Sequence, residues 1–480
     1  MKRIAVIGAG PAGLSAAYEL CAHQEIPVIL ESDPISLGGL SRTGRYRGFC
    51  YDIGGHRFFS KNAEIVRLWR EFLGEDLLEV RRLSKIYYRG RFFDYPLKPW
   101  NALRNLGLSE AVACLADYLK VTLSPRRPVI NFEDWVINAV GERLYKIFFK
   151  TYKEKVWGMP CHLISKDWAA QRIKGLNLFA SLAHSLGWNR KNGPRTLAET
   201  FYYPRLGPGM LWERVGQAVE RAGGRICMGQ QVSRLLRDHH GVHTLVTGSQ
   251  QHAVDSVIST MPLASLVMGL DPPAPSQVQN AANNLAYRDF LTVILLVEGP
   301  PRFPDQWIYV HEPEVKVGRI QSFGNWSPSM APEPNMQCFG LEYFCFEKDA
   351  LWSMSDVQLI SLATRELVHL GLATSEQVRD GTVARAAKAY PVYDQDYGQQ
   401  VGIIRRFLEA ELPNLQVVGR NGMHRYNNQD HAMLTGIMAA RYLLGTGGYN
   451  LWQVNGEAEY IENGCVSESF RLVPKLLHQA

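Results

Sequence analysis

The stretch IAVIGAGPAGLSAAYEL, residues 4–20, carries a glycine loop between two segments of different hydrophobic pattern. The four apolar residues at its start predict a buried strand, and the residues after Gly10 predict a helix that runs to about Ala22. Gly8, Gly10 and Gly13 have the GxGxxG spacing at the point where the strand turns into the helix. This context favours a nucleotide-binding unit over a secretory signal, because glycines and a proline interrupt the apolar run almost at once.

A second apolar strand, residues 27–30, follows this helix and ends in Glu31. An acidic residue at that place can accept hydrogen bonds from the ribose hydroxyls of an adenosine. Gly8 permits the tight turn, and Gly10 lets the backbone approach a pyrophosphate at the helix N-terminus. Gly13 lets the helix pack closely on the strand. The sequence therefore predicts a bound dinucleotide.

A second glycine-rich segment, LGGLSRT at residues 37–43, follows within a few residues of that acid. It resembles the second FAD signature of flavoproteins with two dinucleotide-binding domains, in which the loop packs along the pyrophosphate and ribityl chain. The resemblance implies FAD, with Gly38, Gly39, Leu40 and Arg42 among the cofactor contacts.

Composition sets further limits on the class of protein. The chain has 480 residues, of which 46% are hydrophobic and 20% are charged, so a disordered or coiled-coil protein is excluded. Its mean hydropathy is −0.16, and the densest apolar run, residues 291–297, is far shorter than the ~20 residues of a membrane span. The net charge of +6 lacks the dense basic stripe of a nucleic-acid binder.

Eight dispersed cysteines without a CxxC pair predict thiols in a reducing compartment, with the cytoplasm as the expected location. The histidine-rich stretch DHHGVH, residues 238–243, suggests either a metal site or an exposed hairpin tip. We favour the hairpin tip and expect no metal, because the stretch holds a glycine between two alternating runs.

The expected fold class is α/β, with a Rossmann-like FAD-binding domain assembled from separated stretches. We expect this domain to comprise residues 1–85, 205–272 and 386–450. Insertions then form a mainly helical substrate or lid domain over 86–204 and an antiparallel sheet over 273–385, and residues 451–480 form a peripheral tail.

Individual elements can also be placed within these domains. The alternating residues 86–96 predict a hairpin that turns at Arg89 and Gly90. Hydrophobic periodicity predicts helices over 132–152 and over about 430–444.

Several short motifs follow the glycine loops in a characteristic order. Their order and approximate spacing resemble those of the UDP-galactopyranose mutases, and the resemblance covers most of residues 1–445. The matching residues are GGHRFFS at 54–60, Trp157-Gly158, Arg172, Tyr287-Arg288, Arg319, Tyr390-Pro391, Gly419-Arg420 and Tyr426.

The resemblance implies a redox-neutral reaction in which reduced FAD, through its N5 atom, forms a sugar adduct while a nucleotide pyrophosphate leaves, so that the sugar ring can contract. NADPH is a possible reductant. The implied catalytic residues are His56, Arg172, Arg319 and Arg420. The implied substrate contacts are Trp157, Arg172, Arg288, Arg319, Tyr390 and Tyr426. The implied cofactor contacts, besides those of the two glycine loops and Glu31, are Gly55, His56, Gly419, Arg420, Gln429 and Asp430.

Two features keep other functions open. Asn427, Asn428 and Gln429 stand where the mutases usually carry acidic residues, and His424 stands where they carry an aromatic residue, which leaves the sugar and the nucleotide undecided. The alternatives are an FAD-dependent oxidoreductase of the protoporphyrinogen oxidase, amine oxidase or desaturase type, and a flavin-binding protein without catalysis. Arginines suited to a pyrophosphate favour the mutase. The oligomeric state is not predicted.

Overall fold

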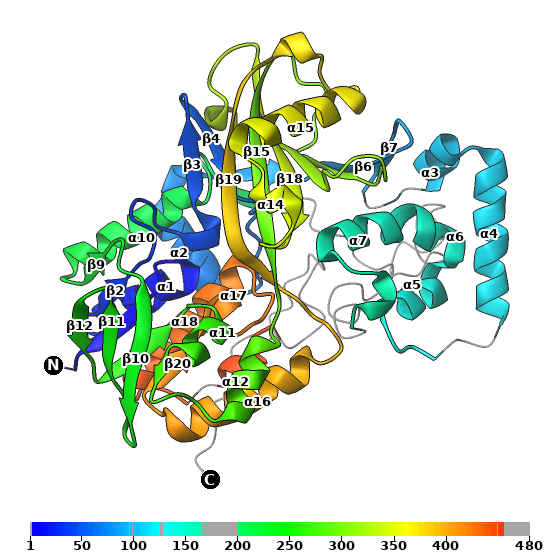
Figure 1. Cartoon of the computed structure of the whole chain (residues 1–480). Coiled ribbons are helices and arrows are strands. Elements are labelled where there is room, and N and C mark those ends of the chain that lie inside the picture. Colours follow the sequence, from blue (N-terminus) through cyan, green and yellow to red (C-terminus); the bar gives the residue numbers. More distant parts are fainter. Residues whose placement is uncertain are drawn as a thin grey trace.

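A parallel sheet forms the nucleotide-binding half of the protein (Figure 1). The structure is a computed structural model that describes residues 2–95, 97, 99–124, 128–165, 200–448 and 450–455. The strand order in this sheet is β20-β13-β1-β2-β9, and every neighbouring pair is parallel. Its strands are β1 (Ile4–Ile7), β2 (Val28–Leu30), β9 (Arg225–Cys227), β13 (Ser256–Ser259) and β20 (Leu415–Val417). This sheet confirms the expected α/β fold class with a Rossmann-like core.

Helices from distant parts of the chain cover this sheet. They are α1 (Pro11–Ala22), α2 (Ala63–Leu73), α10 (Gly209–Arg221), the short α17 (Gly419–Gly422) and α18 (Gln429–Leu443). Helices α1 and α18 pack side by side, and glycines set how close they come: a Cβ atom on Gly436 would lie 2.1 Å from the carbonyl oxygen of Ala12. The predicted helix over 430–444 is confirmed to within one residue.

A small sheet and three helices complete this half. The sheet has the order β12-β11-β10-β14. Its strands are β10 (Val232–Asp238), β11 (Gly241–Thr247), β12 (Gln250–Ala253) and β14 (Leu270–Asp271), and the helices are α11 (Leu263–Met268), α12 (Ser276–Asn283) and α16 (Tyr397–Glu411). The histidine-rich stretch 238–243 turns between β10 and β11, so the expectation of an exposed hairpin is confirmed.

A seven-stranded, mainly antiparallel sheet forms the upper half in Figure 1, in the order β19-β15-β18-β17-β16-β6-β7. Its strands are β6 (Ser84–Tyr88), β7 (Arg91–Asp94), β15 (Tyr287–Glu298), β16 (Trp307–Val310), β17 (Arg319–Ser322), β18 (Met336–Cys345) and β19 (Val378–Pro391). The predicted hairpin with its turn at Arg89 and Gly90 is present as β6 and β7. Its assignment to the helical domain was wrong, because β6 pairs in parallel with β16 of the large sheet.

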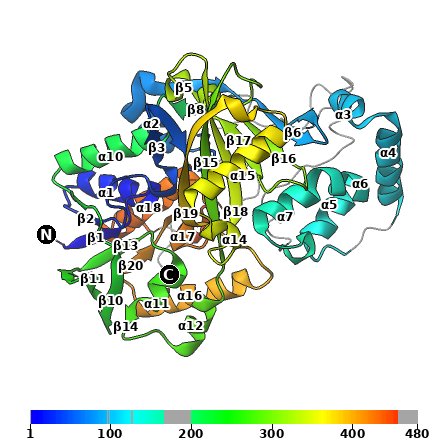
Figure 2. The ribbon, with the colours of Figure 1, turned by 45° about the horizontal axis from the view of Figure 1, so that its top comes forward.

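Smaller elements link the two halves. They include a hairpin of β3 (Thr43–Tyr46) and β4 (Phe49–Asp52), and an antiparallel pair of two strands distant in the chain, β5 (Leu77–Arg81) and β8 (Thr200–Pro204). The helices of the large sheet are α13 (Phe323–Trp326), α14 (Ala350–Ser353) and α15 (Asp356–His369). Figure 2 shows α15 lying across the large sheet.

The helical unit projects to one side in both views (Figures 1 and 2). Its helices are α3 (Pro99–Leu106), α4 (Leu108–Leu123), α5 (Phe132–Val140), α6 (Glu142–Tyr145) and α7 (Thr151–Trp157), with a π-helical turn at Lys146–Lys150. The single helix predicted over 132–152 was wrong. Gly141 interrupts it at a φ of 87°, a left-handed conformation that cannot continue an α-helix.

Two cations, the buried Arg288 and the half-buried Lys155, attach α7 to the large sheet. The guanidinium of Arg288 donates to the carbonyl oxygens of Lys155 (3.1 Å), Val156 (3.1 Å) and Phe344 (2.8 Å). Lys155 in turn donates to three carbonyl oxygens around β16 and β17, those of Val310, Glu312 and Val317. Burial lowers the pKa of Lys155 to about 8. These bonds satisfy carbonyl oxygens of the last turn of α7, which ends at Trp157.

Within the described ranges, none of the helices combines the length and the apolar character that a bilayer crossing requires.

The contact between α1 and α18 can be tested with one methyl group. Replacing Gly436 with Ala places a Cβ against the backbone of Ala12, so the two helices must move apart, at a cost of about 1–3 kcal/mol. We expect Gly436→Ala to lower the melting temperature and the flavin content of the purified protein. The matched control is Gly398→Ala in α16, where a Cβ meets nothing within 4 Å. Equal melting temperatures for both variants would contradict this account.

Candidate active site

A large cleft runs along the carboxyl edge of the parallel sheet and continues beneath the large sheet to the helical unit. Its volume is about 1410 Å³, and its lining includes the ends of β1 and β2, the large sheet and helix α7. Single-ligand pockets usually have ~300–1,000 Å³, so this cleft has room for a cofactor and a second molecule. The strand ends place it where open α/β sheets bind their ligands.

At the sheet end, the two glycine loops meet backbone to backbone. Gly8 has a φ of +94°, and a Cβ on Gly39 would lie 3.3 Å from the Cα of Gly10. Gly10 is also the N-cap of α1, so the helix directs its unpaired N–H groups into this narrow space. Such a cradle of backbone and helix N-terminus is suited to a pyrophosphate.

Glu31 occupies the predicted position at the end of β2 and lines the cleft. Its carboxylate accepts from the backbone N–H of Ala9 (2.5 Å) and of Asp33 (2.7 Å) and from the Ser32 hydroxyl (3.1 Å). A carboxylate has about four lone-pair sites, so it can still accept from a ribose hydroxyl. Arg42 closes the second loop by donating to the carbonyl oxygen of Gly39 (2.8 Å).

A second helix N-terminus faces the same cleft from α18. Its N-cap, Asn428, accepts from the backbone of His431 and donates its own N–H to Nδ1 of that histidine (3.2 Å). Gln429 donates to the carbonyl oxygen of His56 (3.4 Å), while its buried Oε1 has no hydrogen-bond partner among the described residues. The N-terminus of α18 therefore presents partial positive charge to the cleft, together with Oε1 of Gln429 as a hydrogen-bond acceptor.

These features fit the FAD that the sequence resemblance implies. The glycine cradle suits the pyrophosphate, and Glu31 suits the adenosine ribose. The N-terminus of α18 and Oε1 of Gln429 suit the polar edge of a flavin ring, which carries carbonyl oxygens and an N–H group.

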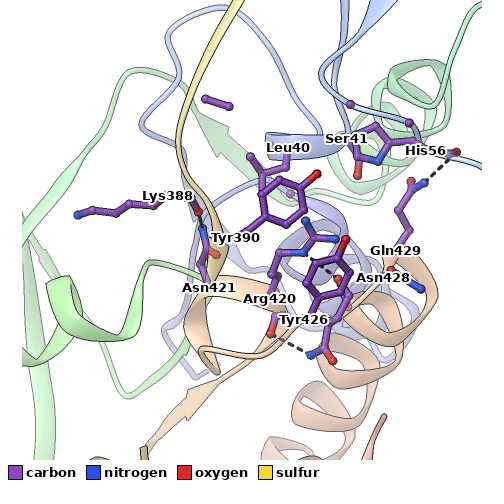
Figure 3. A pocket seen from close by; sticks show the side chains of 18 of the residues that line it. Leu40, Ser41, His56, Lys388, Tyr390, Arg420, Asn421, Tyr426, Asn428 and Gln429 are labelled. Carbon is purple, nitrogen blue, oxygen red and sulfur yellow. Dashed lines mark hydrogen bonds between the residues drawn. The ribbon is translucent and has the colours of Figure 1, made fainter. Parts of the chain in front are cut away.

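His56 lies between the glycine loops and α18 (Figure 3). Its Nε2 lies 2.8 Å from the carbonyl oxygen of Ile53. Burial lowers the pKa of His56 to about 4, and the cations Arg420 and Arg319 lower it as well. The ring is therefore neutral near pH 7, and the nitrogen facing the Ile53 carbonyl carries the proton.

Arg420 and two tyrosines form a stacked cluster beside His56 (Figure 3). The rings of Tyr390 and Tyr426 stack with centroids 5.5 Å apart, and the Arg420 guanidinium lies 4.7 Å from the Tyr426 ring and 5.4 Å from the Tyr390 ring. Arg420 also donates to the carbonyl oxygens of Asn427 (3.0 Å) and Ala389 (3.3 Å). Burial raises the pKa of Tyr390, so its phenol keeps its proton as a donor.

Arg319 stands on β17 and reaches the cleft from the large sheet. Its Nε donates to Glu342, a fully buried carboxylate that also accepts from Gln321. Burial raises the pKa of Glu342, and the guanidinium of Arg319 opposes that rise. Among the described residues, no hydrogen bond reaches the terminal nitrogens of Arg319, so they can bind an anion in the cleft.

Aromatic rings close the far end of the cleft. Trp157 is buried and stacks on Tyr393 at 6.5 Å, and the hydroxyl of Tyr393 accepts the backbone N–H of Tyr426 at 2.6 Å. Tyr152 of α7 stacks on His311 with an interplanar angle of 3°. Burial raises the pKa of Tyr152 well above its ordinary value and lowers that of His311 to about 3.

The structure brings most of the predicted residues together. Those that line the cleft are Gly8, Gly10, Glu31, Gly39, Leu40, Arg42, Gly55, His56, Trp157, Arg319, Tyr390, Gly419, Arg420, Tyr426 and Gln429. Gly13 and Gly38 shape the loops from behind, because a Cβ on either would strike the backbone of Gly8 or the ring of Trp212. Asp430 lies one residue inside α18 and is not among the lining residues.

Two predicted arginines are not among the described residues that line the cleft. Arg288 is 3% exposed, does not line the cleft, and is engaged by the carbonyl oxygens at the end of α7, so its expected contact with substrate becomes a structural role. Arg172 lies outside the described residues.

Sequence reasoning missed several lining residues. They include Arg57, Tyr152, Thr260, Tyr309, His311 and Lys388. Thr260 follows β13 directly, so its place at a parallel strand end was a usable signal. Arg57 follows His56 in the motif itself. Tyr152, Tyr309 and His311 carried no local signal, because only the docking of the helical unit brings α7 and β16 together.

The residues that depart from the mutase pattern differ in whether they line the cleft. Asn427, Asn428 and Gln429 line the cleft at the start of α18, so they can contact a bound molecule. His424 is 1% exposed, packs edge-on against Tyr287 and is not a lining residue.

Comparison with known proteins gives relatives of more than one kind, among them a 15-cis-phytoene desaturase of Synechococcus elongatus that is 32% identical over 20% of this chain and 19% of its own length. The family model described as flavin containing amine oxidoreductase matches residues 11–444. A dTDP-fucopyranose mutase of Escherichia coli is 25% identical over 53% of this chain and 65% of its own length. A probable UDP-galactopyranose mutase of Klebsiella pneumoniae is 26% identical over 33% of this chain and 41% of its own. The chain thus spans less than two thirds of the length of these curated relatives.

The fold also has solved counterparts. The crystal structure of a reduced UDP-galactopyranose mutase superposes with a TM-score of 0.80 at 24% identity, covering 93% of this chain and 96% of that one. At this identity the likeness establishes the fold.

The buried His424, which does not line the cleft, gives a test of how stability depends on pH. Burial lowers the pKa of His424 to about 4, below the ~6.5 of an unfolded histidine. The unfolded chain therefore binds more protons between these values, and stability falls as the pH drops from 6.5 to 4. His424 has a φ of 48°, which asparagine tolerates. We expect His424→Asn to reduce the loss of unfolding free energy on acidification by up to about 1.4 kcal/mol per pH unit, which is measured as a smaller fall in melting temperature.

The control for this measurement is His240→Asn at the exposed hairpin tip. An unchanged pH slope in His424→Asn would show that this histidine does not titrate as its burial implies.

Proposed function

Since the chain belongs to the family of flavin-containing amine oxidoreductases, we propose that it is an FAD-dependent mutase that interconverts ring forms of a nucleotide sugar. The observation that carries this proposal is a polar cluster in the lining of the cleft. There Arg319, Arg420 and the hydroxyls of Tyr390 and Tyr426 gather beyond the glycine cradle. The mutase names of two relatives support the same reaction class.

The residues proposed to hold FAD are those of the two glycine loops, Glu31, Gly55, His56, Gly419 and the start of α18. In its reduced form, FAD supplies a nucleophilic ring nitrogen that can react with the anomeric carbon of a sugar. The α18 N-terminus favours the added negative charge of reduced flavin, because its unpaired N–H groups carry partial positive charge. NADPH is proposed as a possible reductant that binds transiently.

Arg319 and Arg420 would neutralise the pyrophosphate of the substrate as it leaves. The Arg319 fork is held in place through its Nε, so both terminal nitrogens can bind phosphate oxygens without losing the bond to Glu342. Tyr390 and Tyr426 would donate to sugar or phosphate oxygens, and Trp157 would limit the size of the sugar. His56, neutral and hydrogen-bonded, would orient the flavin edge. Arg172 is proposed as a further phosphate ligand on the resemblance alone.

A specific observation also favours the runner-up, an FAD-dependent oxidoreductase. The wall that the helical unit contributes to the cleft is largely apolar, as an oxidase with a hydrophobic substrate would require. It includes Val140, Leu144, Phe148, Phe149 and Val156. The same wall can pack against the base and ribose of a nucleotide sugar, so the two functions must be separated by experiment.

The direct test of the proposed reaction uses the purified holoenzyme, reduced anaerobically with dithionite. Incubated with UDP-galactose, dTDP-fucose and related nucleotide sugars, it should convert one of them into an isomer of equal mass and different retention time. The flavin should stay reduced throughout. Oxygen consumption with an apolar amine or polyene, and no isomer from any nucleotide sugar, would favour the oxidoreductase. If neither the isomerisation nor the oxidation were detected, the result would favour a flavin-binding protein without catalysis.

The role of Arg319 is tested by Arg319→Lys, which keeps the positive charge and removes the fork. Losing a charge-assisted bidentate contact costs about 1.5–3 kcal/mol, so the affinity for the nucleotide sugar should fall roughly 10–100-fold. Calorimetry would measure this affinity, and the flavin content should be unchanged. Arg379→Lys is the matched control, because Arg379 pairs with Glu298 on the surface. Unaltered affinity in Arg319→Lys would remove Arg319 from the phosphate site.

A further inference from the structure

A buried histidine lines the cleft beside α7 and has one ring nitrogen without a protein partner. His311 directly follows β16 and is 2% exposed, and its backbone N–H donates to the carbonyl oxygen of Tyr87 (2.9 Å). Its ring stacks on that of Tyr152 with centroids 5.2 Å apart, and its Nδ1 lies 3.3 Å from the carbonyl oxygen of Ile147. Within the described part of the chain, no hydrogen bond reaches the second ring nitrogen, Nε2. The ring is thus held on two sides, while Nε2 can bond a ligand in the cleft.

The bond to Ile147 sets which nitrogen of His311 carries the proton. A carbonyl oxygen only accepts, so Nδ1 must be the donor. Burial lowers the pKa of His311 to about 3, and the cations Lys155 and Lys153 lower it as well, so the ring is neutral near pH 7. A neutral imidazole that donates through Nδ1 has a lone pair on Nε2. Nε2 of His311 is therefore a hydrogen-bond acceptor.

The carbonyl that orients His311 comes from an irregular part of the helical unit. Ile147 lies in the π-helical turn Lys146–Lys150, which leads directly into α7 with Tyr152. Turns of this kind are rare inside helices and occur frequently at functional sites. Here one continuous segment supplies both the acceptor for Nδ1 and the ring that stacks on the imidazole. The helical unit thus fixes the orientation of a side chain that belongs to the large sheet.

The groups around His311 in the cleft supply mainly donors. Tyr309 pairs with Arg319 across β16 and β17, so both side chains lie on the same face of the large sheet. Alternation places His311, two residues after Tyr309, on that face as well, and all three residues line the cleft. The ring of Tyr152 lies 5.2 Å from that of Tyr309, and neither hydroxyl has a hydrogen-bond partner among the described residues. Two phenols and a guanidinium therefore offer protons to a ligand, and Nε2 of His311 stands beside them as an acceptor.

This contrast selects the kind of ligand group that can meet His311. The oxygens of a pyrophosphate diester carry no proton near pH 7, so they can accept from Arg319 or a phenol but cannot donate to Nε2. A hydroxyl group both donates and accepts, so it fits between Nε2 and a neighbouring phenol. A nucleotide sugar carries hydroxyls on either side of its pyrophosphate, on the ribose and on the sugar.

We propose that Nε2 of His311 accepts a hydrogen bond from a hydroxyl of the substrate, on its ribose or on its sugar, and so selects ligands that carry this hydroxyl. This role rests on the proposed function, because both sources of the hydroxyl belong to a nucleotide sugar. His311 is then a binding and specificity residue, and Tyr152 holds its ring in the required plane. An anionic oxygen at the same place would meet a lone pair instead of a proton, so His311 also restricts where the pyrophosphate can bind.

The experiment is calorimetric titration of the flavin-loaded full chain with UDP-galactose and dTDP-fucose, and with UDP and dTDP alone. His311→Asn keeps an amide donor near Nδ1 but has no group at the position of Nε2, whereas His311→Phe keeps the stacked ring. Both variants should bind the nucleotide sugar about tenfold more weakly, because a substrate hydroxyl loses its acceptor. His311→Gln carries an amide oxygen to the position of Nε2 and should bind within about twofold of the unchanged protein.

The matched control is His424→Asn. His424 is also buried and also lies against one carbonyl oxygen, that of Val392, but it does not line the cleft. Its replacement should leave the affinity unchanged, and all variants should keep their flavin, which shows that they fold. An equal loss of affinity for UDP or dTDP alone assigns the hydroxyl to the ribose, and a loss confined to the nucleotide sugars assigns it to the sugar. Either pattern supports the role of His311.

Two results would overturn this role while the proposed function stands. One is that His311→Asn and His311→Phe bind the nucleotide sugar as tightly as the unchanged protein. The other is that His311→Gln binds as weakly as His311→Asn, since the loss then does not come from the missing acceptor. A different result, no binding of any of the four probes by the unchanged protein, would overturn the proposed function and the role of His311 together.

Discussion

The close approach of three backbone segments is the constraint on which the rest of the site depends. Gly13 brings α1 against the turn at Gly8, Gly436 brings α18 against Ala12, and Gly39 brings the second loop against Gly10. A side chain at any of these places would push the elements apart. Because they touch, two helix N-termini from opposite ends of the chain open into one cleft, and both present N–H groups to it.

The large sheet and the nucleotide-binding half both contribute charged groups to the cleft, and the charges of these groups are balanced. Arg319 is paired with a buried carboxylate, Arg420 lies against two aromatic rings and two carbonyl oxygens, and His56 stays neutral. Each cation is thus held in a defined geometry before any ligand arrives, which lowers the cost of ordering side chains on binding. Arg319 and Arg420 are therefore suited to binding an anionic ligand.

How much could be predicted from the sequence depended on whether the information was local. The glycine loops, Glu31, the hairpin at Arg89 and Gly90 and the helix after Asn428 are set by turn chemistry and hydrophobic period, and each was found. The helix predicted over 132–152 failed at Gly141, which has a φ of 87° and lies so close to α4 that a Cβ there would be 2.8 Å from a carboxylate oxygen of Asp117. The hairpin was placed in the wrong unit because strand pairing with β16 spans more than 200 residues.

The sequence by itself determined the dinucleotide fold, and it predicted most of the residues that line the cleft, because short motifs with fixed backbone requirements encode them. The tertiary structure alone decided which arginine faces the cleft and which one supports it. Arg288 and Arg319 look alike in the sequence, yet only Arg319 lines the cleft, whereas Arg288 is buried against carbonyl oxygens and lies 3.9 Å from Asp349. The structure also decided that the leucines of α4 remain outside the core, because exposure depends on what packs against a helix and not on its own residues.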